Sequence, residues 1–294
     1  MSITPLRLPD ALRIAERALP LAGYIPEEPT SISHGAVNFV LTYSAQAVAL
    51  RVSPLGLAHV VRRGYHLATQ IKDGLSPEFV TVVDSHVVAF FPLAEPQSSS
   101  QSTPWVKAQL IGSRLHALDN LSLHLPPVDP LNDTPQRISY LSTGPLESWV
   151  RPLDISRQRL AAQLLRVSAP LVPLHGDLHA AQVVTVEDRF LLTDFDHAAL
   201  GPKEADWARI YAFFTAGELP GEALSEAIDQ VPYTPSFGLM SLYAKCYVLR
   251  YVSFLARLYL DDPTNTPNHR LAPFARTLGL DTSMLPEPYP PVSL

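Results

Sequence analysis

The sequence predicts an α+β fold in which a small β-rich N-terminal part precedes a larger, mainly helical C-terminal part. Three observations predict it: alternating apolar patterns typical of hairpins before residue 93, a polar break "AEPQSSSQSTP" at 94–104, and helical periodicity through most of the remainder. We therefore expect two domains, at 1–92 and 93–294. With 294 residues, 47% of them hydrophobic and 17% charged, the chain can bury a substantial core.

The N-terminal part opens with an amphipathic pattern, "MSITPLRLPDALRIAERALP", which predicts a helix. Two β-rich runs joined by the polar "SAQ" then predict a hairpin at 34–54, and a helix is expected at 58–73. A second hairpin is expected at 79–93, with its turn at Asp84-Ser85. Alternate residues of the first hairpin should share one buried face: Val37, Phe39, Leu41 and Tyr43.

The C-terminal part begins with an amphipathic pattern that predicts a helix at 104–121, followed by a proline-rich stretch to about residue 135. A further helix is expected at 154–169. Two short strands, "QVVTVE" and "FLLTDF", should then flank a turn at Asp188-Arg189, and helices dominate from residue 203 onward.

Charge and cysteine content exclude several classes of protein. The net charge is −6, from 28 acidic and 22 basic side chains, and no basic stripe is visible, so we expect no nucleic-acid partner. No run of about 18 apolar residues predicts a membrane span, and the N-terminal pattern is not that of a signal peptide, so we expect a cytoplasmic protein. Cys246, the single cysteine, excludes an intrachain disulfide.

The stretch "VPLHGDLHAAQVV" at 172–184 places polar side chains inside an apolar run. Burying such groups without partners costs about 1–3 kcal/mol each, so they are either paired or assembled for chemistry. Gln182 follows Asp177 by five positions and Asp194 follows it by 17. The predicted hairpin should bring Gln182 opposite Asp194, with Asp177 on the loop before it. Two carboxylates and an amide oxygen at one spot suit a hard cation such as Mg²⁺.

Phosphoryl transfer uses such a set: an aspartate to orient the attacking hydroxyl, and an amide and a second aspartate to hold metal. Protein kinases carry H-R-D, four residues and Asn, and later D-F-G. Here "HGD" at 175–177 is followed by four residues and Gln182, then by "DFD" at 194–196. Together with "LLTDFDHAALGPKEADWA", this sequence resembles the aminoglycoside phosphotransferase and choline kinase-like superfamily of small-molecule kinases.

The resemblance implies a bilobal protein kinase-like fold, with a nucleotide-binding lobe at 1–92 and a helical lobe at 93–294 that holds the catalytic loop and the acceptor site. It implies Asp177 as catalytic base and Asp194 with Gln182 as Mg²⁺ ligands, with ATP or GTP as the phosphoryl donor. Asp206 would brace the catalytic loop. The acceptor would be a hydroxyl of a small molecule.

In the N-terminal lobe, "VALR" at 48–51 resembles the kinase V-A-I-K, which implies that Arg51 contacts nucleotide phosphates. Gly35 would lie in the loop over the phosphates, and 89–96 where adenine should pair. Two departures from the pattern stand out. Gln182 replaces the usual Asn, and no Glu occurs between Arg51 and Glu78 to pair with the strand cation; His66 and Gln70 are the polar residues available there.

These departures leave a second interpretation open, a degenerate kinase fold that binds nucleotide or a partner without turnover. A third is a metal-dependent hydrolase that uses the cluster of His175, Asp177, His179, Asp194 and His197. In the kinase interpretation, His175 and His179 are bracing residues. The acidic segment 217–230 is a weak candidate for binding a cationic antibiotic and more readily explained as a solvated helix face. The acceptor, the choice between ATP and GTP, and the oligomeric state stay open.

Overall fold

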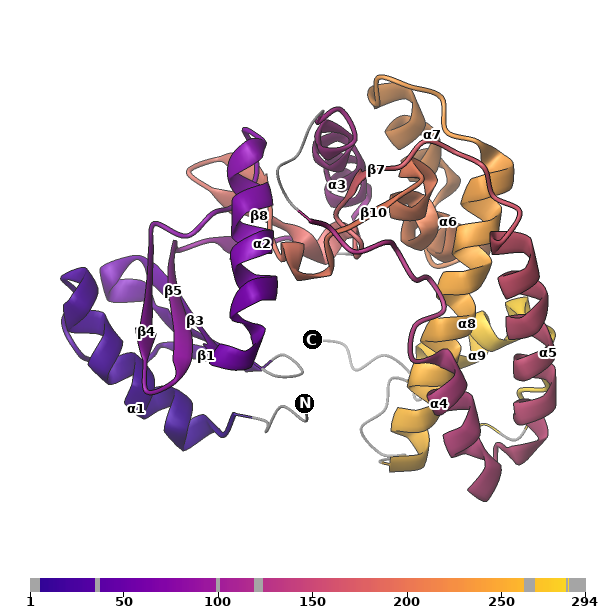
Figure 1. Cartoon of the computed structure of the whole chain (residues 1–294), viewed down its shortest axis with the longest axis horizontal. Coiled ribbons are helices and arrows are strands. Elements are labelled where there is room, and N and C mark those ends of the chain that lie inside the picture. The colour runs from indigo at the N-terminus through magenta and orange to yellow at the C-terminus, as the bar shows by residue number, and fades with distance from the viewer. Residues whose placement is uncertain are drawn as a thin grey trace. The chain divides into compact units, whose positions relative to one another are not determined.

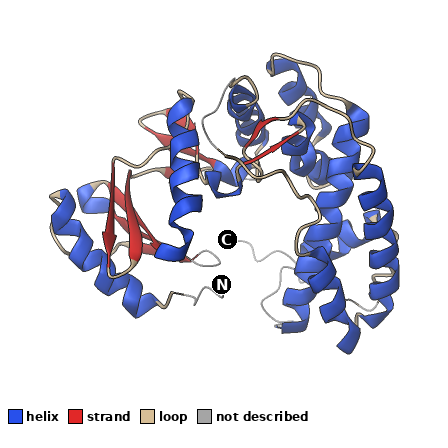
Figure 2. Cartoon of the chain, viewed as in Figure 1, coloured by secondary structure: helices blue, strands red, loops and turns tan. Residues whose placement is uncertain are grey.

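The computed structural model describes residues 6–34, 38–98, 101–118, 124–261, 268–283 and 285. By their internal contacts, these residues form two compact units. The first comprises Met1–Ser99, Leu118–His124 and Ala180–Ala198, and the second comprises Ser100–Ala117, Leu125–His179 and Ala199–Leu294. The predicted α+β class is confirmed, because the first unit is built on a sheet and the second is mainly helical (Figure 1, Figure 2).

A five-stranded antiparallel sheet of order β1-β2-β3-β5-β4 forms the centre of the first unit. Its strands are β1 (Ser31–His34), β2 (Phe39–Tyr43), β3 (Val48–Pro54), β4 (Phe79–Val83) and β5 (His86–Pro92). Both predicted hairpins are present, since β2 pairs with β3 and β4 pairs with β5. Asp84 and Ser85 have φ of 46° and 61°, the positive values that a type I′ two-residue turn requires.

The two faces of this sheet have different roles. Phe39, Leu41 and Tyr43 are buried, as predicted, and pack with α1 (Leu8–Ala18) in one apolar core, while Val37 lies outside the described residues. Figure 1 shows α1 (indigo) and α2 (Ala58–Gln70) on opposite sides of the sheet. The alternation of strand side chains therefore directs every second residue of β3 away from the α1 core.

A smaller three-stranded sheet completes the first unit. It consists of β6 (Glu95–Pro96), β8 (Val183–Val186) and β9 (Arg189–Leu192), in the order β6-β8-β9. Its turn is Glu187-Asp188, one residue before the predicted Asp188-Arg189. Both turn residues have positive φ, 47° and 61°, and Val186 pairs with Arg189, so a two-residue type I′ loop leaves Arg189 in the strand.

The second unit consists mainly of helices and also contains a two-stranded sheet of β7 (Val172–Leu174) and β10 (Ala199–Gly201) (Figure 2). Its helices are α3 (Ser102–Leu115), α4 (Thr134–Tyr140), α5 (Glu147–Leu164), α6 (Ala208–Thr215), α7 (Gly221–Gln230), α8 (Phe237–Asp261) and α9 (Asn268–Thr277). The longest of these, α8, packs against α4, α5, α6 and α9. Within the described part of the chain, no helix is long and apolar enough to span a membrane.

Two helices predicted in this unit have different bounds in the structure, and one helix was not predicted. The helix expected at 104–121 ends at Leu115, and residues 119–123 lie outside the described residues. The helix expected from residue 154 begins at Glu147 and contains Pro152, because Trp149 and Leu153 are buried on one side of it. The proline-rich stretch gives way to a helix, α4, whose Pro135 stands in its first turn, where its missing N–H costs no hydrogen bond.

Candidate functional site

In the first unit, Arg51 extends from the centre of β3 on the face opposite the α1 core. Its strand neighbours Leu50 and Val52 are fully buried in that core, so the pleat turns Arg51 to the other side. There it lines a cavity of about 610 Å³, which is within the usual size range of small-molecule sites. The Arg51 side chain is only 10% exposed, so its charge needs a partner.

Asp196 is that partner. The guanidinium of Arg51 donates from Nη1 to Oδ1 of Asp196 at 3.2 Å and from Nη2 to Oδ2, a bidentate pair. Oδ1 of Asp194 lies 3.6 Å from Arg51 Nη1, and the amide oxygen of Asn38 accepts from Nη2 and Nε at 2.6 and 3.1 Å. Burial opposes the charge of Arg51, but Asp196 and Asp194 raise its pKa, so it stays ionised. The "DFD" segment therefore supplies the acidic partner of Arg51 that the helix predicted at 58–73 lacks.

The backbone around Asp194 and Asp196 is tightly turned. Asp194 has φ 60° and ψ 57°, the left-handed conformation that Asp tolerates better than most residues, and it lies two residues after the end of β9, directly before the 3₁₀ turn Phe195–His197. Helix α2 crosses this turn at Gly64, where a Cβ would lie 3.1 Å from the Phe195 carbonyl carbon and oxygen. Gly64 thus permits the close approach that brings Tyr65 to the cavity lined by Arg51.

The segment at 89–96 also contacts this cavity. Phe91, Pro92, Leu93 and Ala94 line it, together with Pro96 of β6. The N–H of Leu93 donates to the carbonyl of Ala47 at 2.9 Å, so that group is already paired. The ring of Tyr65 meets Phe91 edge-on at 5.5 Å. These side chains give the cavity apolar walls beside its cationic residue. Gly35, the expected phosphate-loop glycine, lies outside the described residues.

Gln182 and Asp194 face each other across the β8–β9 hairpin, as predicted. Gln182 Nε2 donates to Oδ2 of Asp194 at 3.3 Å, and the N–H of Thr193 donates to the Gln182 carbonyl at 2.9 Å, which continues the hairpin pairing past Val183 and Leu192. The Asp194 side chain is 40% exposed. Asp194 thus has carboxylate oxygens open to a ligand in this unit.

In the second unit, the "HGD" loop follows β7 and is held by Asp206, as the resemblance implied. Asp206 lies in the 3₁₀ helix Lys203–Trp207, and its side chain is fully buried. Its Oδ2 accepts from the N–H of His175 and its Oδ1 from the N–H of Gly176, both at 2.9 Å. Gly176 has φ 82°, a conformation that favours glycine. Asp206 therefore fixes the backbone directly before Asp177.

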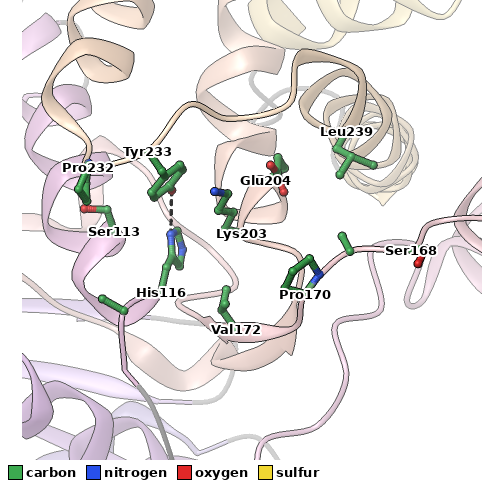
Figure 3. Close-up of a pocket in the computed structure, with 12 residues that line it drawn as sticks. Ser113, His116, Ser168, Pro170, Val172, Lys203, Glu204, Pro232, Tyr233 and Leu239 are labelled. Atoms are coloured by element: carbon green, nitrogen blue, oxygen red, sulfur yellow. Dashed lines mark hydrogen bonds between the residues drawn. The ribbon is translucent and has the colours of Figure 1, made fainter.

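A histidine that the sequence analysis did not single out makes a further contact with the Asp206 carboxylate. His116, at the end of α3, lies with its Nε2 3.0 Å from Oδ2 of Asp206 and its Nδ1 2.8 Å from the hydroxyl of Tyr233. His116 and Tyr233 lie on the wall of a cavity of about 400 Å³, and Nζ of Lys203 lies 3.8 Å from the centroid of the Tyr233 ring. Figure 3 shows the hydrogen bond between His116 and Tyr233 as a dashed line. Contacts from Tyr233 through His116 to Asp206 thus connect the wall of this cavity to the "HGD" loop.

Asp177 has two side-chain partners in the same unit. Nη1 of Arg209, on α6, donates to Oδ1 of Asp177 at 2.9 Å, and Nε2 of His179 lies 3.6 Å from Oδ2. Burial lowers the pKa of His179, against the opposing effect of Asp177, so this ring is neutral near pH 7. The N–H of Asp177 points to Nδ1 of His175 at 3.4 Å. Both histidines therefore brace the loop, as expected, and Asp177 is 26% exposed to a cavity.

The predicted site residues fall into two groups. Arg51, Gln182 and Asp194 lie together in the first unit, whereas Asp177 lies in the second. The convergence of Asp177 with Asp194 stays a prediction. Sequence reasoning missed Arg209 and left the role of Asp196 undecided. A signal for each was present, because Asp196 follows Asp194 in "DFD" and Arg209 follows Asp206 by three positions in "DWAR".

The architecture is the kinase-like fold of small-molecule phosphotransferases. Solved structures that share it include aminoglycoside, macrolide and choline phosphotransferases. A choline/ethanolamine kinase family protein from Mesorhizobium loti matches with a TM-score of 0.65 at 19% identity, covering 94% of this chain and 96% of that one. An amicoumacin kinase in complex with AMP-PNP and Ca²⁺ matches with a TM-score of 0.66 at 12% identity, covering 89% and 92%.

Sequence comparison gives a narrower match. Streptomycin 3''-kinase of Klebsiella pneumoniae is 32% identical over 96 residues, which cover 28% of this chain and 36% of that kinase. The match thus spans about a third of the length of that relative. No protein-family model matches the sequence. The resemblance drawn from "HGDLHAAQ" and "DFD" is thereby confirmed at the level of the fold.

The pairing of Arg51 with Asp196 gives a first prediction. Arg51→Lys keeps the charge but loses the planar fork that holds Asp196 bidentately, and it changes how the cation is aimed into the cavity. We expect the dissociation constant for ATP to rise about 10-fold, equivalent to one charge-assisted hydrogen bond. Calorimetric titration measures it, with Arg189→Lys, an exposed arginine of the same unit, as the control. An unchanged constant contradicts a role for this guanidinium in nucleotide binding.

Proposed function

We propose that this protein is a small-molecule kinase that transfers the γ-phosphoryl group of ATP, or of GTP, to a hydroxyl group of its acceptor. The observation that carries the proposal is the "HGD" loop, in which Asp177 borders a cavity while Asp206 holds the two preceding residues by their N–H groups. The kinase-like fold supports it, as do the nucleotide and Ca²⁺ bound in the amicoumacin kinase structure.

The nucleotide belongs in the 610 Å³ cavity of the first unit. Its apolar walls, Phe91 and Leu93 among them, suit a purine base, and Arg51 supplies a positive charge for the phosphates. Arg51 is held by Asp196, so its position is fixed before a nucleotide arrives. Preorganised charge of this kind stabilises a transition state without the cost of reorganisation.

Asp194 and the side-chain oxygen of Gln182 would hold Mg²⁺. The donors fit the ion, because Mg²⁺ takes oxygen ligands and is commonly bound by one or two side chains together with substrate phosphates and water. The 3.3 Å contact between the two side chains places them close enough to serve one ion, once the Gln182 amide turns its oxygen inward. When bound there, Mg²⁺ would supply positive charge that offsets the charge of the phosphate groups.

Asp177 would orient the acceptor hydroxyl and take its proton. The acceptor oxygen forms a bond to the γ-phosphorus, the bond from that phosphorus to the β–γ bridging oxygen breaks, and the hydroxyl proton passes to the Asp177 carboxylate. Arg209 holds Oδ1 of Asp177 at 2.9 Å and Nε2 of His179 lies 3.6 Å from Oδ2, so the carboxylate is positioned from both sides. Catalysis then depends mainly on positioning, as is usual for phosphoryl transfer.

The two other interpretations have less support. A degenerate site was suggested by Gln182 in place of Asn and by the missing helix Glu. Asp196 supplies the ion pair that Arg51 would otherwise lack, and the Gln182 side chain reaches Asp194 at 3.3 Å. The hydrolase interpretation needs a cluster of metal ligands, and among the described residues no three His, Cys, Asp or Glu side chains are grouped to hold a metal ion. The kinase interpretation accounts for both the Arg51 site and the "HGD" loop.

The decisive experiment is a calorimetric titration of the full chain with ATP and with GTP, each with and without Mg²⁺. We expect Mg²⁺ to tighten binding of the preferred nucleotide, and Asp194→Asn to remove most of that enhancement, because Asn has no charge to offer the ion. Asp188→Asn is the matched control: Asp188 is an exposed turn residue of the same hairpin, with a positive φ that Asn also accepts. Absence of binding at millimolar nucleotide contradicts the proposal.

A further inference from the structure

The cavity beside Asp177 is unusually rich in arginine. It has a volume of about 230 Å³, and Arg137 of α4, Arg209 of α6 and Arg250 of α8 all line it. Asp177 is the one acidic residue among its described lining residues. Three arginines and one carboxylate thus line this small space.

The partners of these arginines leave positive charge uncompensated. Arg209 uses Nη1 for Asp177, while its buried Nε makes no hydrogen bond to any described residue. Arg137 lies 3.6 Å from Asp133, whose side chain is 60% exposed and therefore screened by solvent. In the described part of the chain, the guanidinium of Arg250 has no carboxylate within ion-pair distance. Burial and the charge of Arg250 lower the pKa of Arg137, consistent with mutual repulsion.

The acidic residues that could attract a cationic acceptor are elsewhere. Most of the segment at 217–230 belongs to α7 (Gly221–Gln230), on which Glu222, Glu226 and Asp229 are exposed, while Ala223 and Leu224 are buried. The expectation of a solvated helix face is therefore confirmed. None of these carboxylates lines the cavity beside Asp177.

Aromatic residues of α8 form the remaining wall. Tyr247 and Tyr251 stack with ring centroids 5.5 Å apart and planes 19° from parallel. Arg209 lies over the Tyr247 ring at 5.6 Å and Arg137 over the Phe254 ring at 5.3 Å. These contacts hold the guanidinium planes in fixed orientations, and a fixed fork of donors suits carboxylate or phosphate oxygens.

We propose that the acceptor is a hydroxyl compound that also carries an anionic oxygen group, a carboxylate or a phosphate, which Arg137 and Arg250 bind while its hydroxyl lies at Asp177. This inference rests on the proposed kinase function and names its substrate class. A polycationic aminoglycoside is a poor match for the cavity, since it would face three guanidinium groups. The charge of the cavity thus distinguishes this chain from an enzyme that acts on a cationic antibiotic.

The test is calorimetry on the full chain saturated with Mg·AMP-PNP, so that the nucleotide site is already occupied. Inorganic phosphate, glycerol 3-phosphate and glycerate are titrated as anionic probes, glycerol as the neutral probe, and choline and streptomycin as cationic probes. We expect the anions to bind and Arg250→Gln to weaken them about 10-fold or more. Arg257→Gln is the matched control: it removes one charge from the same helix, but Arg257 is exposed, pairs with Asp261 and does not line the cavity.

The outcomes separate this inference from the function on which it rests. Binding of choline or streptomycin in preference to the anions overturns the anionic acceptor, and so does an equal loss of anion affinity in Arg250→Gln and Arg257→Gln. Phosphate alone, bound equally well by the parent chain and by Arg250→Gln, overturns it as well. If Mg·AMP-PNP itself fails to bind, while Arg250→Gln still weakens phosphate, the kinase function fails and the anion site stands.

Discussion

Asp177→Asn should lower kcat about 10²- to 10⁴-fold while leaving the dissociation constant for Mg·ATP within about 2-fold of the parent value, which is the range that removal of a general base produces. Asn has nearly the same shape as Asp but cannot accept the hydroxyl proton. The proposed nucleotide site contains Arg51 and Asp194 and belongs to the other unit, so it should be unaffected. ATP consumption with an acceptor and calorimetric titration measure the two quantities.

The control for this variant must separate chemistry from folding. Asn at position 177 leaves Arg209, whose side chain is 21% exposed, without its anionic partner, so a loss of about 1–2 kcal/mol in the free energy of unfolding is expected. Rates should therefore be compared well below the melting temperature. Asp154→Asn, in the same unit but on the surface of α5, should keep full activity. Equal loss of turnover and nucleotide affinity in Asp177→Asn would show that Asp177 is not the base.

The "DFD" segment explains how the first unit manages without the helix Glu found in protein kinases. One carboxylate, Asp196, neutralises Arg51, and the other, Asp194, stays 40% exposed beside Gln182. One turn thus supplies both Asp196, the partner of Arg51, and Asp194, the proposed metal ligand. Arg51 at 3.6 Å from Asp194 also offsets the repulsion between the two carboxylates.

Features encoded by short-range patterns could be predicted from the sequence. Alternation at Phe39, Leu41 and Tyr43 identified the buried face of β2, and the two-residue turn at Asp84-Ser85 fixed the β4–β5 hairpin. The pairing of Gln182 with Asp194 followed from hairpin length alone. Each of these depends on residues that are close together in the chain, where spacing determines geometry.

Features that depend on distant residues could not be predicted. Arg51 and Asp196 are 145 positions apart, and Asp177 and Arg209 are 32 apart, so no local pattern records either pair. The cavity charge arises because α4, α6 and α8 bring Arg137, Arg209 and Arg250 together, although the whole chain is acidic. The strands β7 and β10 were missed because each has three residues, too few for a periodic signal.

Asp206→Asn should lower the free energy of unfolding of the second unit by about 3–5 kcal/mol at pH 7, the cost of breaking a buried charged network. The fully buried carboxylate accepts hydrogen bonds from two backbone N–H groups and contacts His116. The NH₂ group of Asn would instead lie against one of these groups, and two donors cannot form a hydrogen bond. Burial opposes ionisation, but the hydrogen bond and charge of His116, the charge of His175 and the N–H of Gly176 together lower the pKa of Asp206 from 3.8.

The lowered pKa of Asp206 determines how the loss of stability in Asp206→Asn depends on pH. A carboxyl whose folded pKa is depressed stabilises the fold fully above its unfolded value of 3.8, and that contribution disappears as the pH falls through the folded pKa. The difference in the free energy of unfolding between the parent and Asp206→Asn should therefore be constant from pH 7 to about 5 and shrink below pH 3.8.

Urea unfolding followed by tryptophan fluorescence measures this difference for the second unit alone, because Trp105, Trp149 and Trp207 all lie there. Asp229→Asn, exposed on α7, should change stability by less than about 0.5 kcal/mol. A loss in Asp206→Asn that persists unchanged in acid would mean that shape, not charge, is what Asp206 contributes to the loop.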